Sequence, residues 1–141
     1  MPLDITLRQV ERQDLEQVVS MLQSISHYVP EPGSSDATWQ QISAQGNVLS
    51  VVATLDQLIV GYGSIVIETK IRGGKMGHIE DIVAHLDYRG EGIGKLLLET
   101  LAKIAESHGC YKIALQCGEH NVDFYAKCGF QLAGQSMQKF L

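Results

Sequence analysis

The segment YRGEGIGK (residues 88–95) constrains the fold of this chain most, because it places three glycines within eight residues. Glycine weakens regular helices and strands, so this density predicts a turn whose backbone adopts conformations that other residues avoid. The apolar run HIEDIVAHL comes before it, and Ile93, Leu97, Leu101 and Ile104 recur after it at helical spacing. The sequence therefore predicts a strand, a glycine-rich turn and a long amphipathic helix, in that order.

A glycine-rich turn at the start of a helix is suited to binding an anion, because unpaired backbone N–H groups converge there and the helix dipole favours negative charge. Two common phosphate-binding patterns do not match this turn. The Walker A pattern GxxxxGK[ST] requires a hydroxyl residue after its lysine, where this chain has a leucine, and the dinucleotide pattern GxGxxG differs from the GxGxG of Gly90, Gly92 and Gly94. The pattern that fits is R-x-x-G-x-G, which begins at Arg89.

The rest of the sequence alternates between short apolar runs and helical patterns, in the order β-α-α-β-β-β-α-β-α-β. Periodicity and turn residues predict strands at residues 3–9, 48–55, 58–69, 78–86, 111–117 and 130–140. They predict helices at about 12–26, around Trp39 and Ile42 with Asp36 as a candidate cap, at 92–108 and at 121–129. The second and third strands read as an antiparallel hairpin, and residues 78–117 as a right-handed crossover between parallel strands. This order predicts an α/β or α+β sandwich with a mixed sheet.

Length and charge exclude several classes of protein. A chain of 141 residues is most simply a single domain, 1–141. Its net charge of −5 argues against nucleic-acid binding, which depends on cationic contacts to phosphates. No apolar run approaches the roughly 20 residues of a membrane span, and the N-terminus lacks the pattern of a signal peptide. The predicted compartment is therefore the cytoplasm.

The cysteines and histidines do not indicate a metal site. Cys110, Cys117 and Cys128 form no CxxC pair, so neither a disulfide framework nor a structural zinc site is predicted. His78 and Glu80 spell the HxE of zinc deaminases, but the PCxxC that must follow it is missing. The sequence therefore predicts an activity without a bound metal.

Residues 77–130 contain the segments GHIEDI, GKLL, GCYKI and NVDFYAKCGF in order. Together with the R-x-x-G-x-G turn, these segments resemble the GNAT superfamily of N-acetyltransferases, and most closely its glucosamine 6-phosphate N-acetyltransferases. The resemblance implies a GNAT fold of the α/β (α+β) class, with a mixed, mostly antiparallel sheet of about six to seven strands flanked by about four helices and splayed between its fourth and fifth strands. It also implies acetyl-CoA as co-substrate, a small-molecule amine as acceptor and a homodimer.

The same resemblance implies where the coenzyme binds. The backbone of Ile82, Val83 and Ala84 would pair with the pantetheine arm, and one of these amides would act as an oxyanion donor. The pyrophosphate would bind the turn and the helix start, formed by Arg89, Gly90, Glu91, Gly92, Ile93, Gly94 and Lys95. Asn121 would contact the pantetheine, with a plain helix cap as the alternative role.

Three residues are candidates for the chemistry. Tyr125 occupies the position where the superfamily places a general acid for the coenzyme thiolate, and a phenol with a pKa near 10 is protonated at neutral pH. Its alternative role is a half-buried packing tyrosine. Glu80 and Asp81 are adjacent on a strand, so their side chains are expected to face opposite sides. In the resembling family this pair orients the amine and helps to accept its proton, with Glu80 as the candidate base; the alternative is a pair of charges at a strand edge.

Four further residues occupy positions that contact the phosphosugar in the resembling family: Lys70, Arg72, Tyr111 and Lys112. A phosphate ester requires two or more cations of this kind, although each one alone is also typical of a protein surface.

Two positions and one segment depart from the family pattern. Gln116 replaces an acidic residue and Phe140 replaces an arginine. Residues 24–33 read SISHYVPEPG, where the family usually has threonine and glycine at the end of the first helix. Other primary amines, such as a polyamine, an amino acid or a protein N-terminus, therefore stay open as acceptors. A non-catalytic acetyl-CoA-binding module is the alternative from a different class.

Overall fold

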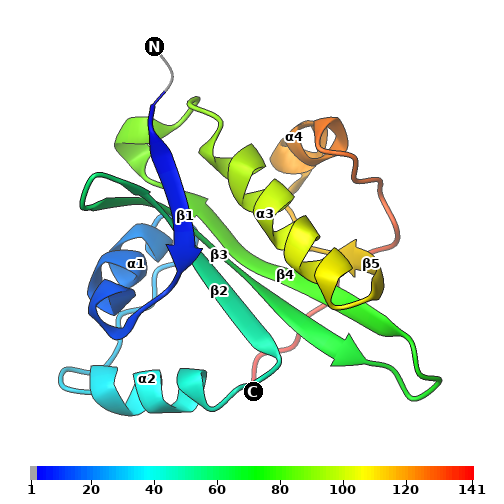
Figure 1. The fold of residues 1–141 in the computed structure, drawn as a ribbon, viewed down its shortest axis with the longest axis horizontal. Helices are drawn as coiled ribbons and strands as arrows, with labels where there is room; N and C mark the ends of the chain where they lie inside the picture. The colour runs from blue at the N-terminus through cyan, green and yellow to red at the C-terminus, as the bar shows by residue number, and fades with distance from the viewer. Residues whose placement is uncertain (1–2) are drawn as a thin grey trace.

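The computed structural model describes residues 3–141, which form one sheet and the helices around it (Figure 1). The strands are β1 (Ile5–Gln9), β2 (Val48–Leu55), β3 (Leu58–Thr69), β4 (Lys75–Ala84) and β5 (Cys110–Ala114). The α-helices are α1 (Leu15–Leu22), α2 (Ser35–Ser43), α3 (Ile93–Ser107) and α4 (Val122–Lys127). Short 3₁₀ turns cover Arg12–Asp14, Leu86–Tyr88 and Glu119–Asn121.

The five strands lie in the sheet in chain order, β1-β2-β3-β4-β5. The first four pair antiparallel, and β5 pairs parallel to β4 after the α3 crossover. The predicted hairpin at 48–55 and 58–69 is confirmed with the same bounds, because β-branched residues fill both strands and Asp56 adopts the left-handed conformation (φ 54°) that the tight connection requires. The parallel pairing within residues 78–117 is confirmed as well.

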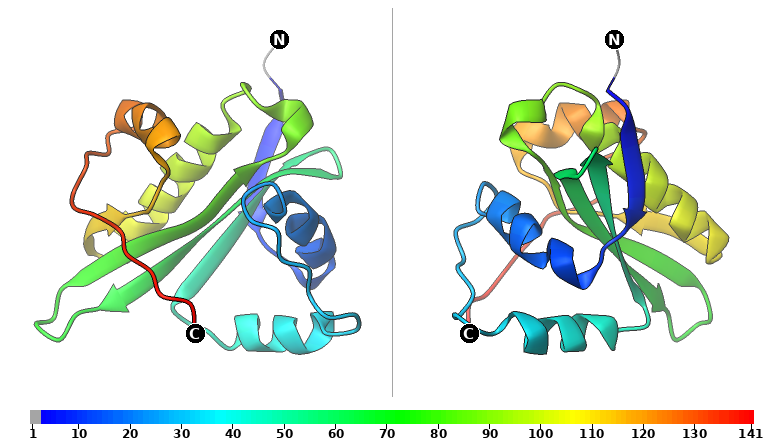
Figure 2. Two further views of the ribbon diagram at one scale, coloured as in Figure 1. Left: turned by 180° about the vertical axis from the view of Figure 1, so that it is seen from behind. Right: turned by 60° about the vertical axis from the view of Figure 1, so that its left-hand side comes forward.

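The expectation of six to seven strands was wrong, because residues 3–141 form five. The missing element is the strand predicted at residues 130–140, which is extended chain outside regular structure and exposed from Gln131 onward. A strand requires a partner for its backbone N–H and C=O groups, and this segment pairs with no strand among the described residues. Instead it crosses the face of the sheet that also carries α1 (Figure 2).

The first helix is shorter than predicted. A 3₁₀ turn replaces its start, and α1 ends at Leu22 rather than near residue 26. The Gln23 side-chain amide then pairs with the backbone of Tyr28, donating to its carbonyl at 2.7 Å and accepting from its N–H at 3.0 Å. These contacts satisfy backbone groups that a longer helix would have used, so the chain turns away into the loop before α2.

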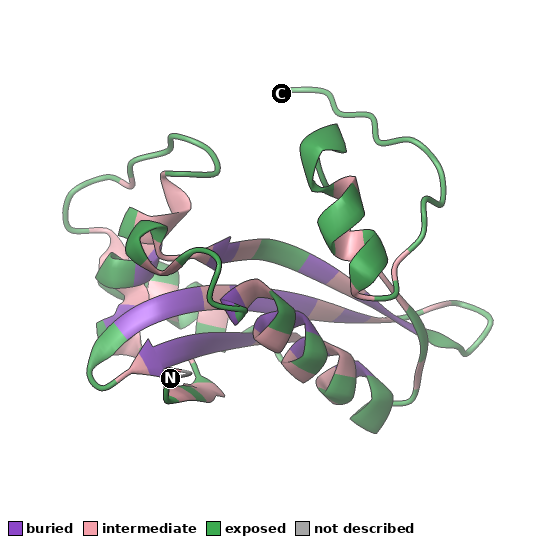
Figure 3. Ribbon diagram, turned by 90° about the horizontal axis from the view of Figure 1, so that it is seen from above, coloured by how far each residue is buried: buried purple, intermediate pink, exposed green. Residues whose placement is uncertain are grey.

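The two faces of the sheet bury separate apolar clusters. Ile65, Ile67 and Ile79 face α3, where they meet Leu97 and Leu101. The opposite face packs on α1, where Val52, Ile59 and Tyr62 meet Val18. Figure 3 shows the buried stretch concentrated in the middle strands, with exposed residues on the outer helices and the C-terminal segment. This division identifies the face to which each side chain of β3 and β4 belongs.

An ion pair holds the start of α1 against β1. Asp14 is only 3% exposed, and both of its carboxylate oxygens accept hydrogen bonds from Arg8, at 2.6 and 2.8 Å. The Asp14 carboxylate also accepts from the Glu11 backbone N–H at 2.8 Å. The hydrogen bonds from Arg8 lower the pKa of Asp14, while burial opposes them. The pair fixes the 3₁₀ turn that leads into α1.

Candidate active site

The sheet opens between β4 and β5. The two strands pair from Lys75 opposite Cys110 as far as His78 opposite Ala114, and β4 continues to Ala84 without β5 beside it. The predicted splay is therefore present, and Ile82, Val83 and Ala84 lie in the part of β4 beyond it. Backbone N–H groups on this edge are available to an extended ligand.

A bulge interrupts β4 at the two candidate carboxylates. Ser64 pairs with Glu80 and Tyr62 with Val83, so two residues of β4 stand opposite Gly63 alone. Asp81 has a positive φ of 58°, which is uncommon for a residue other than glycine. The bulge interrupts the regular alternation of β4 directly after Glu80, and the side chains of Glu80 and Asp81 are both exposed.

The bulge also decides where the following residue points. Ile79 packs on the α3 side, so strict alternation would send Ile82 to the α1 side, yet Ile82 packs on the α3 side. The extra residue restores Ile82 to that core and leaves the exposed carboxylates at the point where β4 leaves β5. Bulges recur next to active sites, where they re-aim side chains.

The glycine-rich turn adopts the conformation that its sequence predicts. Gly90 and Gly92 have positive φ angles of 84° and 81°, and Gly92 immediately precedes α3. The first N–H donated within α3 is that of Leu96, to Gly92, so the amides of Ile93, Gly94 and Lys95 have no partner within the helix. These amides and the positive end of the α3 dipole form a site for a phosphate group.

The third glycine of the turn has a different role. A Cβ at Gly94 would lie 3.1 Å from the Phe124 ring, so this glycine lets α4 approach the first turn of α3. Arg89 is exposed beside the turn, and its guanidinium donates to Ser24 Oγ at 3.5 Å. A groove of about 510 Å³ runs along the turn. It is lined by Leu3, by Ile5 at the start of β1, and by Gly90, Glu91, Gly92, Lys95, Leu96 and Glu99.

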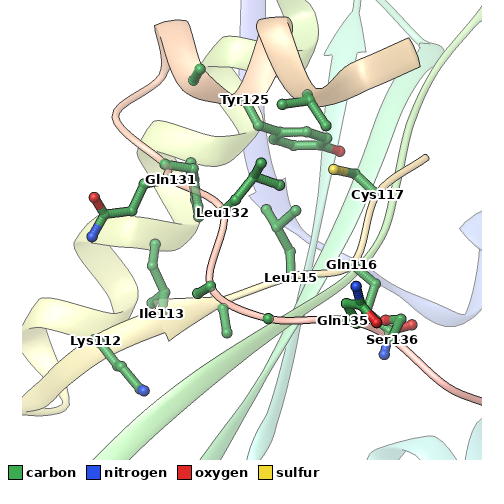
Figure 4. A pocket seen from close by; sticks show the side chains of 16 residues that line it. Lys112, Ile113, Leu115, Gln116, Cys117, Tyr125, Gln131, Leu132, Gln135 and Ser136 are labelled. Atoms are coloured by element: carbon green, nitrogen blue, oxygen red, sulfur yellow. The ribbon is translucent and has the colours of Figure 1, made fainter. Parts of the chain in front are cut away.

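Tyr125 lies on α4 and points into a second cavity, of about 610 Å³, between β5, α4 and residues 130–136. In Figure 4 its hydroxyl points toward the part of this cavity that holds Cys117. The ring packs edge-on against Phe124 and Phe130, with centroids 5.1 and 5.9 Å away. Burial raises the pKa of Tyr125, and the neighbouring thiols of Cys117 and Cys128 raise it further. The phenol is therefore protonated at neutral pH and is able to donate a proton.

The candidate substrate residues lie at one end of β4 and β5. Lys112 lines the Tyr125 cavity at the end away from the tyrosine (Figure 4), and its ammonium is 5.8 Å from the centroid of the Tyr111 ring. Lys70 and Arg72 belong to the connection between β3 and β4, and Arg72 is exposed. The Lys70 ammonium is paired with the Glu68 carboxylate at 2.9 Å.

The structure brings only some of the predicted residues together. Tyr125 and Lys112 share one cavity with Gln116. Asn121 is exposed at the start of α4, and its side chain makes no capping hydrogen bond. Glu80 and the glycine-rich turn line other surfaces, on β4 and at the start of α3.

One pair of residues was not predicted as part of a site. His78 contacts Glu68 across the β3–β4 pair, with 2.8 Å between Nε2 and Oε1. The sequence contained a signal for it: each residue is next to a buried isoleucine on adjacent strands, Glu68 after Ile67 and His78 before Ile79, which places both on the other face of the hairpin. Within residues 3–141, no three His, Cys, Asp or Glu side chains form a metal-binding group. None of the described helices is long and apolar enough to cross a membrane.

Comparisons with known proteins agree with this geometry. The model of the acetyltransferase (GNAT) family matches residues 15–130. A glucosamine 6-phosphate N-acetyltransferase of Trypanosoma brucei brucei is 34% identical over 140 residues, 96% of this chain and 95% of that protein. Glucosamine 6-phosphate N-acetyltransferase 1 of Dictyostelium discoideum is 42% identical over 108 residues, 73% of this chain and 69% of that protein.

A solved structure shows the same fold along nearly all of this chain. The crystal structure of glucosamine-6-phosphate N-acetyltransferase from Arabidopsis thaliana superposes with a TM-score of 0.89 at 30% sequence identity, and the match covers 96% of this chain and 97% of that one. The family match, these relatives, the opened sheet and the glycine-rich turn agree with one another. This chain therefore belongs to the GNAT family of acetyltransferases, enzymes that take their acetyl group from acetyl-CoA, and is itself an N-acetyltransferase.

Proposed function

We propose that this enzyme transfers the acetyl group of acetyl-CoA to the amine of glucosamine 6-phosphate. The observation that carries the proposal is the 34% identity to the Trypanosoma brucei brucei enzyme of that name across 95% of its length. Seven further relatives with that name or its "probable" form match at 32–42% identity. An acceptor that is both an amine and a phosphate ester also suits a site with exposed carboxylates and several cations.

The described residues fit acetyl-CoA. Gly90 and Gly92 hold the turn in a conformation that exposes backbone N–H groups, and the free amides of residues 93–95 face the same region. We assign the pyrophosphate to this turn, with Arg89 and Lys95 as its cations. The unpaired stretch Ile82–Ala84 would bind the pantetheine arm through its backbone, as a strand added to β4.

When bound, acetyl-CoA supplies a thioester, which is an activated acyl donor. An N–H of residues 82–84 is the donor for the oxygen on which negative charge develops. Glu80 and Asp81 orient the acceptor amine through their carboxylates. The free amine forms the new C–N bond as the C–S bond breaks, and the Tyr125 hydroxyl gives its proton to the departing thiolate. The acetylated nitrogen then loses one proton to solvent, and solvent returns a proton to the Tyr125 phenolate.

Lys70, Arg72, Lys112 and Tyr111 are assigned to the phosphosugar. Lys112 and Arg72 are exposed, whereas Lys70 is paired with Glu68. The two exposed cations meet the need of a phosphate ester for charge-assisted hydrogen bonds. They also supply the positive charge that the family arginine would have provided at Phe140.

The proposal includes a homodimer of single-domain subunits. The C-terminal segment carries Leu132, Met137, Phe140 and Leu141 as exposed large apolar side chains. It ends beside a sheet whose last strand, β5, pairs on one side only. Exposed apolar patches and free strand edges are typical of protein interfaces, and a second copy of this chain would cover both.

Sedimentation velocity is expected to give the mass of two chains. Removal of residues 132–141 is expected to give the mass of one, and a monomeric full-length chain would contradict the proposal.

The proposed compartment is the cytoplasm. Cys110, Cys117 and Cys128 are free thiols, as expected in a reducing compartment.

The experiment that tests the proposed activity measures release of free thiol from acetyl-CoA. Purified enzyme is offered glucosamine 6-phosphate and, in parallel, unphosphorylated glucosamine at equal concentration. Rapid release with the phosphate ester and slow release with glucosamine is the expected result. Equal rates would show that the phosphate is not recognised, and no release with either sugar would contradict the acceptor and direct the search to polyamines, amino acids and peptide N-termini.

A further inference from the structure

The residues Glu68, His78 and Lys70 form a polar cluster beside the proposed acceptor site. Glu68 lies near the end of β3, Lys70 in the connection that follows, and His78 on β4. A single oxygen of Glu68, Oε1, contacts both neighbours: His78 Nε2 at 2.8 Å and Lys70 Nζ at 2.9 Å. The cluster is partly exposed, so ligands in the open part of the sheet have access to it.

His78 lies on the same face of the sheet as Glu80. The pairing of β4 with β3 is regular from Val66–His78 to Ser64–Glu80, because the bulge begins only after Glu80. Ile79, between them, packs on the α3 side, so His78 and Glu80 both face the side that carries α1. Two residues along a strand span roughly 7 Å. One water molecule is enough to connect the imidazole to an amine held at Glu80.

The contact with Glu68 determines which nitrogen of neutral His78 carries the proton. Lys70, and then His78, lower the pKa of Glu68, so its carboxylate is ionised at neutral pH. An ionised carboxylate only accepts hydrogen bonds, so the proton of the neutral imidazole lies on Nε2. Nδ1 then presents a lone pair, and it has no hydrogen-bond partner within residues 3–141. A carboxylate that orients an imidazole and leaves its other nitrogen free is the arrangement used for general bases.

The reaction requires such a base. A sugar ammonium must lose a proton before its nitrogen attacks the thioester, and a carboxylate is a weak base compared with an imidazole at neutral pH. We infer that His78, held by Glu68, accepts the proton of the acceptor ammonium through one water molecule, while Glu80 orients the amine. After this proton transfer the amine is neutral, and the carboxylate of Glu68 stabilises the imidazolium of His78. The inference rests on the proposed function, because it requires an ammonium acceptor.

Charged groups from four parts of the fold share the face of His78 or contact its cluster. Glu68 on β3 and Glu80 on β4 bring carboxylates, whereas Lys70 in the connection and Lys112 on β5 bring ammonium groups. Lys112 is opposite Met76, two residues before His78, and so belongs to the same face. Removal of a neighbouring carboxylate and removal of a neighbouring ammonium group are therefore expected to move the acid limb of the pH–rate profile in opposite directions.

The first test replaces His78 by glutamine, which keeps an N–H for Glu68 but takes up no proton. We expect kcat with glucosamine 6-phosphate to fall about 100-fold at pH 7, the lower end of the usual contribution of a general base. The loss should shrink as the pH rises toward the pKa of the free amine, and added imidazole should restore part of the rate. His108→Gln is the matched control, because the His108 ring contacts only the end of α3. The inference would be overturned if the pH dependence of kcat in H78Q had the same shape as in wild type at every pH.

The second test uses the two neighbours of His78. Glu68→Gln removes a negative charge, so the acid limb of kcat/KM should move to lower pH; Lys70→Gln removes a positive charge, so the limb should move to higher pH. A cluster with a purely structural role would lower stability in both variants and move neither limb. Shifts in the same direction, or none, would contradict the inference.

A third measurement needs no turnover. Long-range ¹H–¹⁵N spectra of the free protein distinguish the two tautomers of a histidine, and H78Q identifies the signal. We expect the Nε2–H tautomer in wild type, and an Nδ1–H tautomer would overturn the inference even if H78Q folded poorly. The outcomes also separate the two proposals. If wild type does not acetylate glucosamine 6-phosphate, the proposed function fails; if wild type is active and H78Q keeps its acid limb, only the inference about His78 fails.

Discussion

Gly63 lies directly against the side chain of Ile82. A Cβ atom at position 63 would come within 2.6 Å of Ile82 Cδ1 and within 3.2 Å of Leu101 Cδ1. Gly63 is also the single residue of β3 that stands opposite the bulge of β4. The absence of a side chain at position 63 therefore gives the bulged strand the space to return Ile82 to the core on the α3 side.

Substitution of Gly63 is expected to disturb the proposed oxyanion donors at residues 82–84. Gly63→Ala should lower the free energy of unfolding by about 1 kcal/mol and Gly63→Val by up to about 3 kcal/mol, since overpacking forces neighbouring side chains out of place. Both should reduce kcat. Urea unfolding and thiol-release kinetics measure the two effects. Gly46→Ala is the control, because a Cβ there meets no atom within 4 Å; a G63V enzyme with wild-type kcat would show that the bulge tolerates displacement.

Gly92→Ala is expected to weaken acetyl-CoA binding as well as stability. Gly92 has a φ of 81°, in the left-handed region, where alanine costs about 1–2 kcal/mol. Gly109, at the end of α3, has a nearly equal φ of 79° and equally open surroundings. The two alanine variants should therefore lose similar stability, but only G92A should raise KM for acetyl-CoA. Calorimetric titration with coenzyme A measures the difference, and equal affinities would place the pyrophosphate elsewhere.

Much of this architecture was predictable because its determinants are local. The bounds of β2 and β3 follow from β-branched runs around a two-residue turn, and the left-handed Gly90 and Gly92 follow from the glycine spacing. The same reasoning located Tyr125 on a short helix closed by Gly129, whose φ of 94° ends it. In each case the residues that determine the structure are close in sequence.

The features that sequence reasoning missed depend on distant partners. Residues 130–140 have a strand-like pattern, but a strand forms only where its backbone pairs with another strand, and this segment pairs with none within residues 3–141, although the outer edge of β5 is free. The bulge at Asp81 depends on Gly63 across the sheet, and the Glu68–His78 contact on the register of β3 against β4. A linear pattern gives the face of a residue but not its neighbour on the adjacent strand.

Tyr125→Phe is expected to slow turnover and to leave coenzyme affinity unchanged. Loss of a general acid typically costs about 100-fold or more in rate, whereas the ring and its packing against Phe124 and Phe130 stay in place. Because burial raises the pKa of Tyr125, the wild-type phenol keeps its proton until the pH exceeds the usual value near 10. The alkaline limb that Tyr125 produces in kcat should therefore lie above pH 10. Tyr28→Phe, which alters an exposed ring, is the control; an unchanged kcat in Y125F would assign Tyr125 to packing alone.

The pair formed by Arg8 and Asp14 is expected to support stability at neutral pH and to fail in acid. Asp14→Asn leaves the Arg8 guanidinium without its carboxylate and should cost about 1–3 kcal/mol at pH 7. The hydrogen bonds from Arg8 lower the folded-state pKa of Asp14 below its unfolded value of 3.8, so the contribution is complete above that value and is lost as the pH falls through the folded-state pKa.

The difference in unfolding free energy between wild type and Asp14→Asn should thus be constant from pH 7 to pH 5 and shrink below about pH 4. Urea unfolding followed by circular dichroism at pH 7, 5, 4 and 3 measures it. KM for acetyl-CoA should not change, because Asp14 belongs to the turn before α1 and lines neither the Tyr125 cavity nor the groove beside the glycine-rich turn. A difference that persists unchanged at pH 3 would show that Asp14 acts through its hydrogen bond to the Glu11 backbone rather than through its charge.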